Sequence, residues 1–537
     1  MGRWNRWFQK VFRKQQKDHS SSPLSSLVEE TTESTSDPNF SEEINSSSSE
    51  KEISIVHADK SWLKHMRSSN HPTTSSCQFI FDSDVLFIVF QFLRDDYKFL
   101  LSKCKLVCKQ WYECVTRVPL SLKLGYDHFN QYKKALFSNY LKPSTFYNTN
   151  VTELFLSTNR VLTANHFKCL VNNLSSRRPL TFEEGSTGGA NPNNTTPQKI
   201  VHFSCSDELG VNHIRALFHT YPSLWNHLKH LDLFSNKLSE NHIEVFVSSG
   251  FSFSHLETLY LSHNAINDEG VKILMERGFR SLGMSYSLKK LALDSNEISK
   301  EAVKVIAENP NMKNLTCLKL GMNMIGDAGI QSLTSSENLQ NLTELNLGLC
   351  KFTTEGAKLL STSVYLRSLR SLSISANNIN QEGAQYLSQP GTSLQNLTEL
   401  DLNFCKIGDD GLEKLMSGHC IQNVTDLSLR GNDISERGIE FLAHPKKRPF
   451  QIYAKLQFLD LSQNSIGDTG VKKLVNFSNE QLSHLRDLNL FGTDIGDEGM
   501  QAVMNCEQWK KSLQYCRIGK NPNISAKVRG LNHQRFL

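Results

Sequence analysis

The chain has 537 residues, of which 38% are hydrophobic and 21% are charged. This composition excludes a wholly disordered chain, and a mean hydropathy of −0.39 excludes a protein with many membrane spans. The formal net charge is +5, but residues 1–17 alone carry six Lys and Arg and no acid, which leaves the remainder of the chain at −1. A basic tail on a neutral body does not predict a nucleic-acid-binding surface.

Residues 1–17 predict a basic amphipathic helix. Trp4, Trp7, Phe8 and Phe12 recur at helical spacing on one side, and cations lie between them. Such a helix can make weak contact with an anionic membrane surface or dock in the groove of a partner. The alternative is a helix that packs on the protein's own body.

Residues 18–76 predict a disordered linker. Between Ser20 and Glu50, 12 of 31 residues are serine, and most of the others are acidic or small. The segment cannot bury enough apolar surface to offset the entropy of the chain. Serines beside acids can be phosphorylated, but such a composition is more often a simple tether.

Residues 77–120 predict a small helical domain. The segment 79–93, FIFDSDVLFIVFQFL, is too apolar for a surface helix. After a polar break, a second segment places Leu100, Val107 and Trp111 on one helical side. A domain of this size is marginal by itself and commonly needs an interface.

These two segments resemble an F-box, whose family pattern ends in Leu-Val-Cys-Lys-x-Trp and is matched by Leu106 to Lys109 and Trp111. The start departs from the family pattern, because Asp82 stands where proline is usual. The resemblance implies that this domain binds the Skp-family adaptor. It assigns to the adaptor Phe81, Val85, Leu86, Val89, Phe90, Leu93, Leu106, Val107 and Trp111. A helical cap on the following array is the alternative.

A connecting segment, residues 121–150, leads to a repeat array at residues 151–530. The pattern L-x-x-L-x-L recurs at residues 228, 256, 288, 315, 342, 369, 397, 424, 456 and 485. Degenerate copies at Val151, Ile200 and Leu513 bring the total to about 13 repeats, with an insertion near 184–197. Alternation in this pattern predicts a short strand whose leucines point inward.

These are leucine-rich repeats, and their period of about 28 residues, with a full helix in each, resembles the ribonuclease-inhibitor-like class. The resemblance implies an α/β horseshoe-shaped solenoid, with parallel strands inside the bend and helices outside. The predicted fold is therefore this solenoid, preceded by a small all-α F-box-like domain and a disordered N-terminal region.

Other repeat positions predict structural roles. Asn occupies the ninth position of seven repeats, where it can bond turn backbone that would otherwise be buried unpaired. Cys350 and Cys405 replace it in two repeats and are interpreted as repeat positions, not as nucleophiles or metal ligands. The Asn-x-Thr triplets that begin at Asn150, Asn314, Asn341, Asn396 and Asn423 are likewise interpreted as repeat features. Acids in the following Ile-x-Asp-x-Gly pattern should favour the positive helix N-terminus, and its glycines, such as Gly329 and Gly499, should allow close packing.

The third, fifth, seventh and eighth positions of each repeat should line the concave face. Exposed aromatics beside charged residues there are typical of a protein-binding hot spot, and an acidic bias favours a partner with a basic segment. The predicted client-binding residues are Phe404, Phe458, Phe491, Tyr515, Glu399, Asp401, Asp426, Arg430, Asp460 and Asp487. A solvated polar face without a ligand is the alternative.

The sequence contains no P-loop, Gly-x-Ser-x-Gly or His-Glu-x-x-His signature in a suitable context, so we expect no catalytic residue, metal or cofactor. The F-box resemblance implies a substrate receptor of an SCF-type cullin–RING ubiquitin ligase, with the adaptor, a cullin and a protein client as partners. A GTPase-regulating or scaffolding protein similar to the Ran GTPase-activating protein is the alternative, with Arg430 as its candidate arginine.

The cysteine pattern and the N-terminus predict where the protein is located. Twelve cysteines without a C-x-x-C pair, and no signal peptide, predict a cytoplasmic protein, with the nucleus and a membrane surface as further locations.

Overall fold

The computed structural model describes residues 119–125, 150–157, 164–165, 167–168, 171, 200–206, 208–280, 286–443, 455–477 and 482–530. The predicted helix at 1–17, the linker and the segment that resembles an F-box lie outside these residues, apart from Pro119 and Leu120.

Fourteen strands form one parallel sheet in which each strand pairs with the next in the sequence. The strands are β1 (Pro119–Gly125), β2 (Asn150–Ser157), β3 (His202–Cys205), β4 (His230–Asp232), β5 (Thr258–Tyr260), β6 (Lys290–Ala292), β7 (Cys317–Lys319), β8 (Glu344–Asn346), β9 (Ser371–Ser373), β10 (Glu399–Asp401), β11 (Asp426–Ser428), β12 (Phe458–Asp460), β13 (Asp487–Asn489) and β14 (Tyr515–Arg517). Strand β1 covers the last two residues of the predicted F-box-like segment and the first five of the predicted connecting segment, and it pairs with β2, so the sheet begins before Val151.

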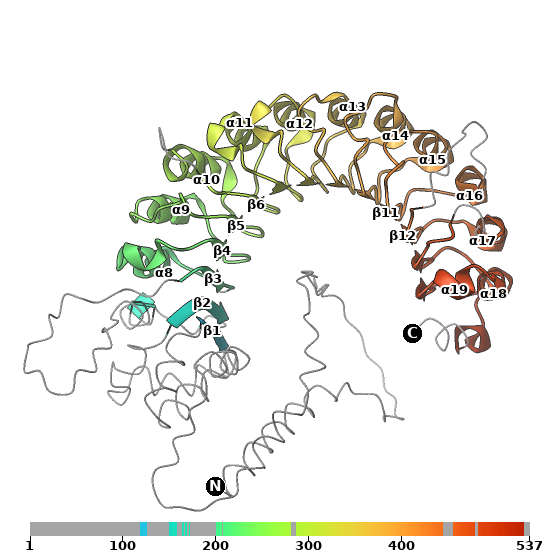
Figure 1. Ribbon diagram of the computed structural model, residues 1–537, viewed down its shortest axis with the longest axis horizontal. Helices are drawn as coiled ribbons and strands as arrows, with labels where there is room; N and C mark the ends of the chain where they lie inside the picture. Colours follow the sequence, from blue (N-terminus) through green and yellow to red (C-terminus); the bar gives the residue numbers. More distant parts are fainter. Residues whose placement is uncertain are drawn as a thin grey trace, which may run out of the picture. The chain divides into compact units, whose positions relative to one another are not determined.

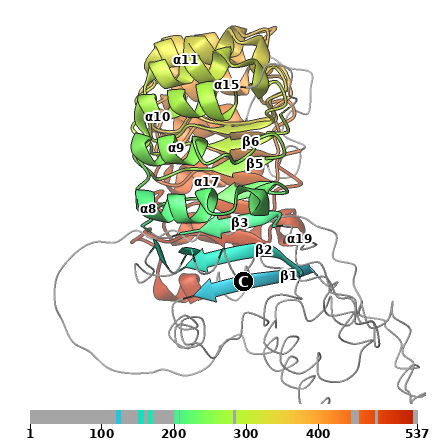
Figure 2. The same cartoon turned by 90° about the vertical axis from the view of Figure 1, so that its left-hand side faces the viewer.

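A helix follows most strands. The α-helices are α8 (Val211–Ile214), α9 (Glu240–Val247), α10 (Asn267–Ile273), α11 (Lys300–Glu308), α12 (Gly326–Thr334), α13 (Thr354–Thr362), α14 (Asn380–Ser388), α15 (Gly408–Met416), α16 (Glu436–Ala443), α17 (Gly467–Asn476), α18 (Asp497–Asn505) and α19 (Trp509–Ser512). Two π-helical turns, Arg215–His219 and Leu274–Gly278, extend α8 and α10, and short 3₁₀ turns cover Pro222–Trp225, Pro310–Met312 and Glu337–Leu339. The strands lie inside the bend and the helices outside (Figure 1), and the strands stack in chain order (Figure 2). The predicted α/β solenoid is confirmed.

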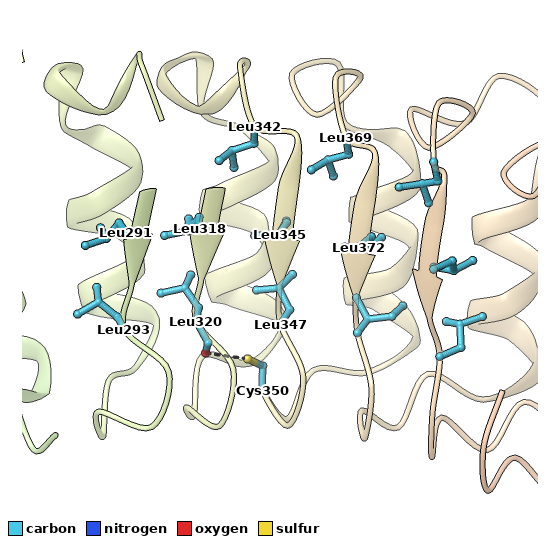
Figure 3. Close-up of a cluster of buried hydrophobic side chains, with 14 of the residues drawn as sticks. Leu291, Leu293, Leu318, Leu320, Leu342, Leu345, Leu347, Cys350, Leu369 and Leu372 are labelled. Atoms are coloured by element: carbon cyan, nitrogen blue, oxygen red, sulfur yellow. Dashed lines mark hydrogen bonds between the residues drawn. The ribbon is translucent and has the colours of Figure 1, made fainter. Parts of the chain in front are cut away.

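The core lies between the strands and the helices. Leu342, Leu345 and Leu347, the three leucines of one repeat, are at most 1% exposed and pack beside the equivalent leucines of neighbouring repeats (Figure 3). From the helix side, Ile330 and Leu333 of α12 are fully buried. Because each repeat covers the apolar face of the next, the core is continuous along the array.

The ninth-position asparagines form a ladder between repeats. The side-chain oxygen of Asn264 accepts hydrogen bonds from the N–H groups of Asn236 and Leu238, both at 2.9 Å. Its amide donates to the carbonyls of Leu233 at 3.0 Å and Leu261 at 2.8 Å. One side chain therefore satisfies four buried backbone groups, which confirms the predicted role of this position.

The acids of the Ile-x-Asp-x-Gly pattern join neighbouring repeats. Asp327, in the first turn of α12, accepts hydrogen bonds from the backbone N–H and the hydroxyl of Thr353, the residue before α13, both at 2.8 Å. Asp268 and Asp409 make the same bonds to Ser299 and Ser435. These carboxylates cap the helix of the following repeat in addition to facing the N-terminus of their own helix.

The glycines of this pattern allow the close approach that the sequence predicted. A Cβ atom on Gly329 would lie 2.9 Å from Cβ of Ile325, and one on Gly499 would lie 2.4 Å from a carboxylate oxygen of Asp468. Neither separation leaves room for a side chain.

Candidate functional site

The predicted adaptor-binding residues, from Phe81 to Trp111, lie outside the described residues. The predicted client-binding residues all lie on β10 to β14 or just after these strands. The parallel register places third positions side by side, so that Glu399 pairs with Asp426, Asp426 with Phe458, and Phe458 with Asp487. The structure therefore brings these side chains together on the concave face.

Two of these acids are held within the array. Asp401 accepts a hydrogen bond from the N–H of Asn403 at 3.0 Å. Asp460, which is 9% exposed, accepts from the N–H of Ser462 at 2.8 Å and from the side-chain amide of Asn489 at 3.0 Å. Both carboxylates bond the backbone two residues onward and so help to end their strand. They are less available to a partner than acids that face solvent.

The other acids differ in how far their charge is neutralised. Asp487 forms a bidentate ion pair with Arg517, with both N–O distances at 3.0 Å. Burial raises the pKa of the Asp487 carboxyl, and the nearby guanidinium opposes this shift. Glu399 and Asp426 accept hydrogen bonds from neighbouring hydroxyl groups. These two acids are therefore the best placed to attract a basic segment.

The aromatic side chains also contact neighbouring repeats. Phe404 is 43% exposed, and one face of its ring lies against the next repeat, with the guanidinium carbon of Arg430 5.2 Å from the ring centre. Phe491 lies beneath Lys520, whose ammonium group is 5.5 Å from that ring centre. Phe458 and Phe491 are half-buried, whereas Tyr515 is 52% exposed. Phe404 and Tyr515 are therefore the predicted aromatics with the largest free surface.

A row of apolar side chains includes Phe404, and its other three members were not named from the sequence. Met322 is 52% exposed and Leu349 is 49% exposed, and both occupy the eighth position, as do Ala376 and Phe404 in the next two repeats. We call these four residues the apolar ridge. All four have a left-handed backbone, with φ between 54° and 59°, a conformation that costs a residue with a side chain about 1 kcal/mol or more.

The sequence signal for the ridge was the residue type at the eighth position: four consecutive repeats have Met, Leu, Ala and Phe there, where other repeats carry Ser, His, Gly, Gln or Lys. Large apolar side chains exposed in adjacent repeats are typical of a surface that a partner covers. The ridge ends at Phe404, and thus joins the aromatic part of the predicted client-binding surface.

Three buried cysteines are protonated at neutral pH. Burial raises the pKa of Cys317, Cys350 and Cys405 to about 12 in each case. The thiols of Cys350 and Cys405 donate to the carbonyls of Leu320 at 3.2 Å (Figure 3) and Ile374 at 3.3 Å. The thiolate is the reactive form, so these contacts confirm that Cys350 and Cys405 serve as repeat positions.

Two further features concern the described part of the chain. In that part, no three or more His, Cys, Asp or Glu side chains are grouped so that they could hold a metal ion. Among the described helices, none combines the length and the apolar character needed to cross a bilayer.

Eight segments match the family model described as Leucine Rich repeat: residues 254–275, 311–333, 338–361, 365–388, 393–416, 420–443, 454–475 and 481–504. With the geometry above, these matches show that the chain is a leucine-rich-repeat protein. Repeats of this kind provide a surface for binding proteins.

Three solved structures are among those with a similar arrangement. An internalin (inlF) from Listeria monocytogenes shares 18% identity over 61% of this chain and 88% of its own, with a TM-score of 0.34. The Rad7 and Elc1 complex of yeast shares 17% identity over 61% of this chain and 81% of its own, with a TM-score of 0.36. The TLR13–ssRNA13 complex shares 18% identity over 70% of this chain and 48% of its own, with a TM-score of 0.35. Likeness at this level concerns the repeat fold alone. No curated protein sequence matches the chain significantly.

Proposed function

We propose that this chain is the substrate-recognition subunit of an SCF-type cullin–RING ubiquitin ligase. The observation that carries the proposal is the sequence of Leu106 to Trp111, which follows the F-box pattern and precedes a leucine-rich-repeat array. In this arrangement residues 77–120 bind the Skp-family adaptor, which connects the chain to a cullin. The array then holds a protein client.

The concave face supports the second half of the proposal. It combines the apolar ridge, which includes the exposed side chain of Phe404, with the acids Glu399 and Asp426. It therefore offers both an apolar contact and a negative charge. A client with an apolar anchor and a nearby basic segment fits this combination. The chain itself performs no chemistry in this scheme, because ubiquitin transfer belongs to other subunits that the complex brings close to the client.

The alternative, a GTPase-regulating protein, rests on Arg430. The guanidinium of Arg430 lies against Phe404, and its Nε is buried without a hydrogen-bond partner in the described residues. An arginine that stabilises phosphoryl transfer must reach out to the nucleotide. The stacked position of Arg430 does not favour that role, so we prefer the receptor.

The ligase proposal is tested by co-purification. Replacing Val89 and Phe90 with alanine in the full chain should abolish recovery of the adaptor and the cullin from cells, because both side chains would be buried at that interface. The matched control is Val364→Ala with Phe234→Ala, which removes the same two residue types from exposed positions of the array. Adaptor and cullin recovery that is unchanged in the first variant, with an unchanged melting temperature, would reject the F-box assignment.

The proposed complex works in the cytoplasm or the nucleus. Residues 1–17 add a further contact, since an amphipathic helix with six cations can bring the ligase to an anionic membrane. Pelleting with anionic liposomes should then fall when residues 1–17 are removed. Equal pelleting of the two forms would exclude the membrane contact.

A further inference from the structure

A groove of about 950 Å³, lined by polar and basic residues, crosses the array where the chain enters strands β7 to β12. Its walls come from four Asn-x-Thr triplets that begin at Asn314, Asn341, Asn396 and Asn423. Arg367, Ser368, Arg370 and Lys455 complete them. None of these residues belongs to the predicted client-binding set, and none is acidic. The groove is therefore a separate surface with a positive charge.

The triplets are partly used by the array. Each of the four asparagines donates one side-chain amide hydrogen to a carbonyl of the preceding repeat, at 2.7 to 3.1 Å. The hydroxyls of Thr316, Thr343 and Thr398 each donate their single hydrogen to such a carbonyl, at 3.1 Å. The hydroxyl of Thr425 is within reach of both the carbonyl of Thr398, at 3.1 Å, and the carboxylate of Asp426, at 2.5 Å, so its single hydrogen is also used within the array. The threonine oxygens can therefore only accept further hydrogen bonds, while each asparagine keeps one amide hydrogen to donate. A ligand in the groove meets both donors and acceptors.

The two arginines of the groove take part in none of the ion pairs found among the described residues. Both of them, Arg367 and Arg370, are exposed. The positive charge extends along this edge. Three positions of each repeat lie at this edge: the two residues before the first position of the L-x-x-L-x-L pattern and the one residue after it. In the repeats of β4 to β14, these positions hold eight Lys or Arg and a single acid, Glu257. Lys229 and Lys289 each contact Glu257 at 2.8 Å, so that acid is already paired.

We propose that this groove binds an extended acidic peptide segment of a partner protein. The N–H groups of a peptide main chain can donate to the threonine oxygens, and its carbonyls can accept from the asparagine amides. Acidic side chains at intervals along the segment pair with Arg367, Arg370 and Lys455. The inference does not rest on the ligase proposal, because no residue of the F-box segment or of the client-binding set takes part.

Nucleic acid fits the same groove less well. The DNA backbone carries no donor for the four threonine oxygens, that of RNA offers only the 2′-hydroxyl, and the lining contains no aromatic side chain on which a base could stack. Three cations are also few beside the roughly six to ten phosphate contacts that give strong electrostatic binding. The chemistry of the lining therefore favours a peptide.

Fluorescence anisotropy with the full chain at low ionic strength tests the proposal. The probe is a fluorescein-labelled peptide of alternating Glu and Ser, about eight residues long, which spans the groove at roughly 3.3 Å per residue. Peptides of alternating Gln and Ser or Lys and Ser, and an oligothymidine of similar length, are the comparison probes. We expect the Glu-Ser peptide to bind most tightly and to weaken as salt is added.

Variants identify the groove as the site. Arg367→Glu with Arg370→Glu should weaken the Glu-Ser peptide by about tenfold or more, because two attractive charges become repulsive. The control, Lys300→Glu with Lys304→Glu, makes the same charge change on exposed positions of α11 and should leave binding within about twofold. Thr343→Val with Thr398→Val keeps the shape but removes two acceptors, and should weaken binding about threefold.

Each other outcome overturns the inference. No binding of the Glu-Ser peptide to the wild-type chain would reject the site. If the α11 control variant weakens binding of the Glu-Ser peptide equally, the effect depends on the net charge of the chain and not on the groove. Tighter binding of the oligothymidine would assign the groove to nucleic acid. Melting temperatures of all variants confirm that the array remains folded in each comparison.

Discussion

The asparagine ladder makes a quantitative prediction for stability. Asn323 is 3% exposed, and its side-chain oxygen accepts from the N–H groups of Asn296 at 2.9 Å and Ile298 at 3.2 Å. Its amide donates to the carbonyls of Leu293 and Leu320, both at 2.9 Å. Asn323→Ala removes all four bonds. Two buried N–H groups without an acceptor cost about 1–3 kcal/mol each, so the free energy of unfolding should fall by about 2–6 kcal/mol.

Cysteine offers a graded comparison at the same position. The thiol of Cys350 donates to the carbonyl of Leu320, and its sulfur accepts from the N–H of Asn323. A cysteine therefore replaces one donor and one acceptor of the asparagine. Asn323→Cys should thus lose about half as much stability as Asn323→Ala, while Cys350→Asn should cost little.

Two measurements are needed because a solenoid unfolds in parts. Urea unfolding gives the total loss, and hydrogen exchange locates it, which we expect in the amides of β6 to β8. The control is Asn241→Ala, at an exposed position of α9, which should change stability by less than about 0.5 kcal/mol. A loss for Asn323→Ala as small as that of the control would refute the accounting of buried N–H groups.

Three further predictions concern other parts of the array. Asp409→Ala removes both bonds to Ser435 and should cost about 1–2 kcal/mol, whereas Asp410→Ala, which breaks an exposed ion pair, should cost under about 0.5 kcal/mol; urea unfolding compares them. Two lysines lower the pKa of Glu257 from 4.5 to about 2, so the advantage of the wild type over Glu257→Gln should be complete above about pH 4.5 and vanish as the pH falls to about 2. Urea unfolding across that range checks it, and an advantage that does not change with pH would contradict it. Phe404→Ala should reduce recovery of clients by affinity purification and mass spectrometry, with a loss of about 2 kcal/mol or more in binding and unchanged melting; full recovery would remove Phe404 from the client surface.

The repeat fold could be predicted from the sequence because one pattern carries it. The three buried leucines, the ninth-position asparagine and the glycine at the start of the helix each meet a local structural requirement that most repeats share. The role of Asp327 was predicted less completely. Its attraction to a helix N-terminus follows from charge, but its bonds to Thr353 depend on how two repeats pack, which no single repeat contains.

The candidate site could be predicted by position but not by availability. Asp401 and Glu399 look alike in the sequence, yet Asp401 bonds the backbone of its own strand end while Glu399 faces solvent. Met322 and Leu349 read as ordinary apolar residues, because their exposure follows from the left-handed turn at the eighth position. The distinction in both cases lies in backbone geometry, which residue type alone does not determine.

Three rows of side chains now run along the array, and their order constrains how a partner lies on it. The basic groove comes first, at the start of the strands, then the acids of the third position, and then the apolar ridge at the eighth. Arg370 and Leu349 lie in neighbouring repeats and six positions apart within the repeat, which corresponds to roughly 20 Å of extended chain. A partner segment that runs parallel to the strands can therefore engage all three rows over a short length, whereas a partner that follows the curve of the array uses one row. Salt separates the two cases, because groove contacts weaken as charge is screened and ridge contacts do not. A partner that retains most of its affinity at high salt and loses it with Leu349→Ala lies along the ridge, whereas one that is sensitive to both salt and Leu349→Ala lies across the rows.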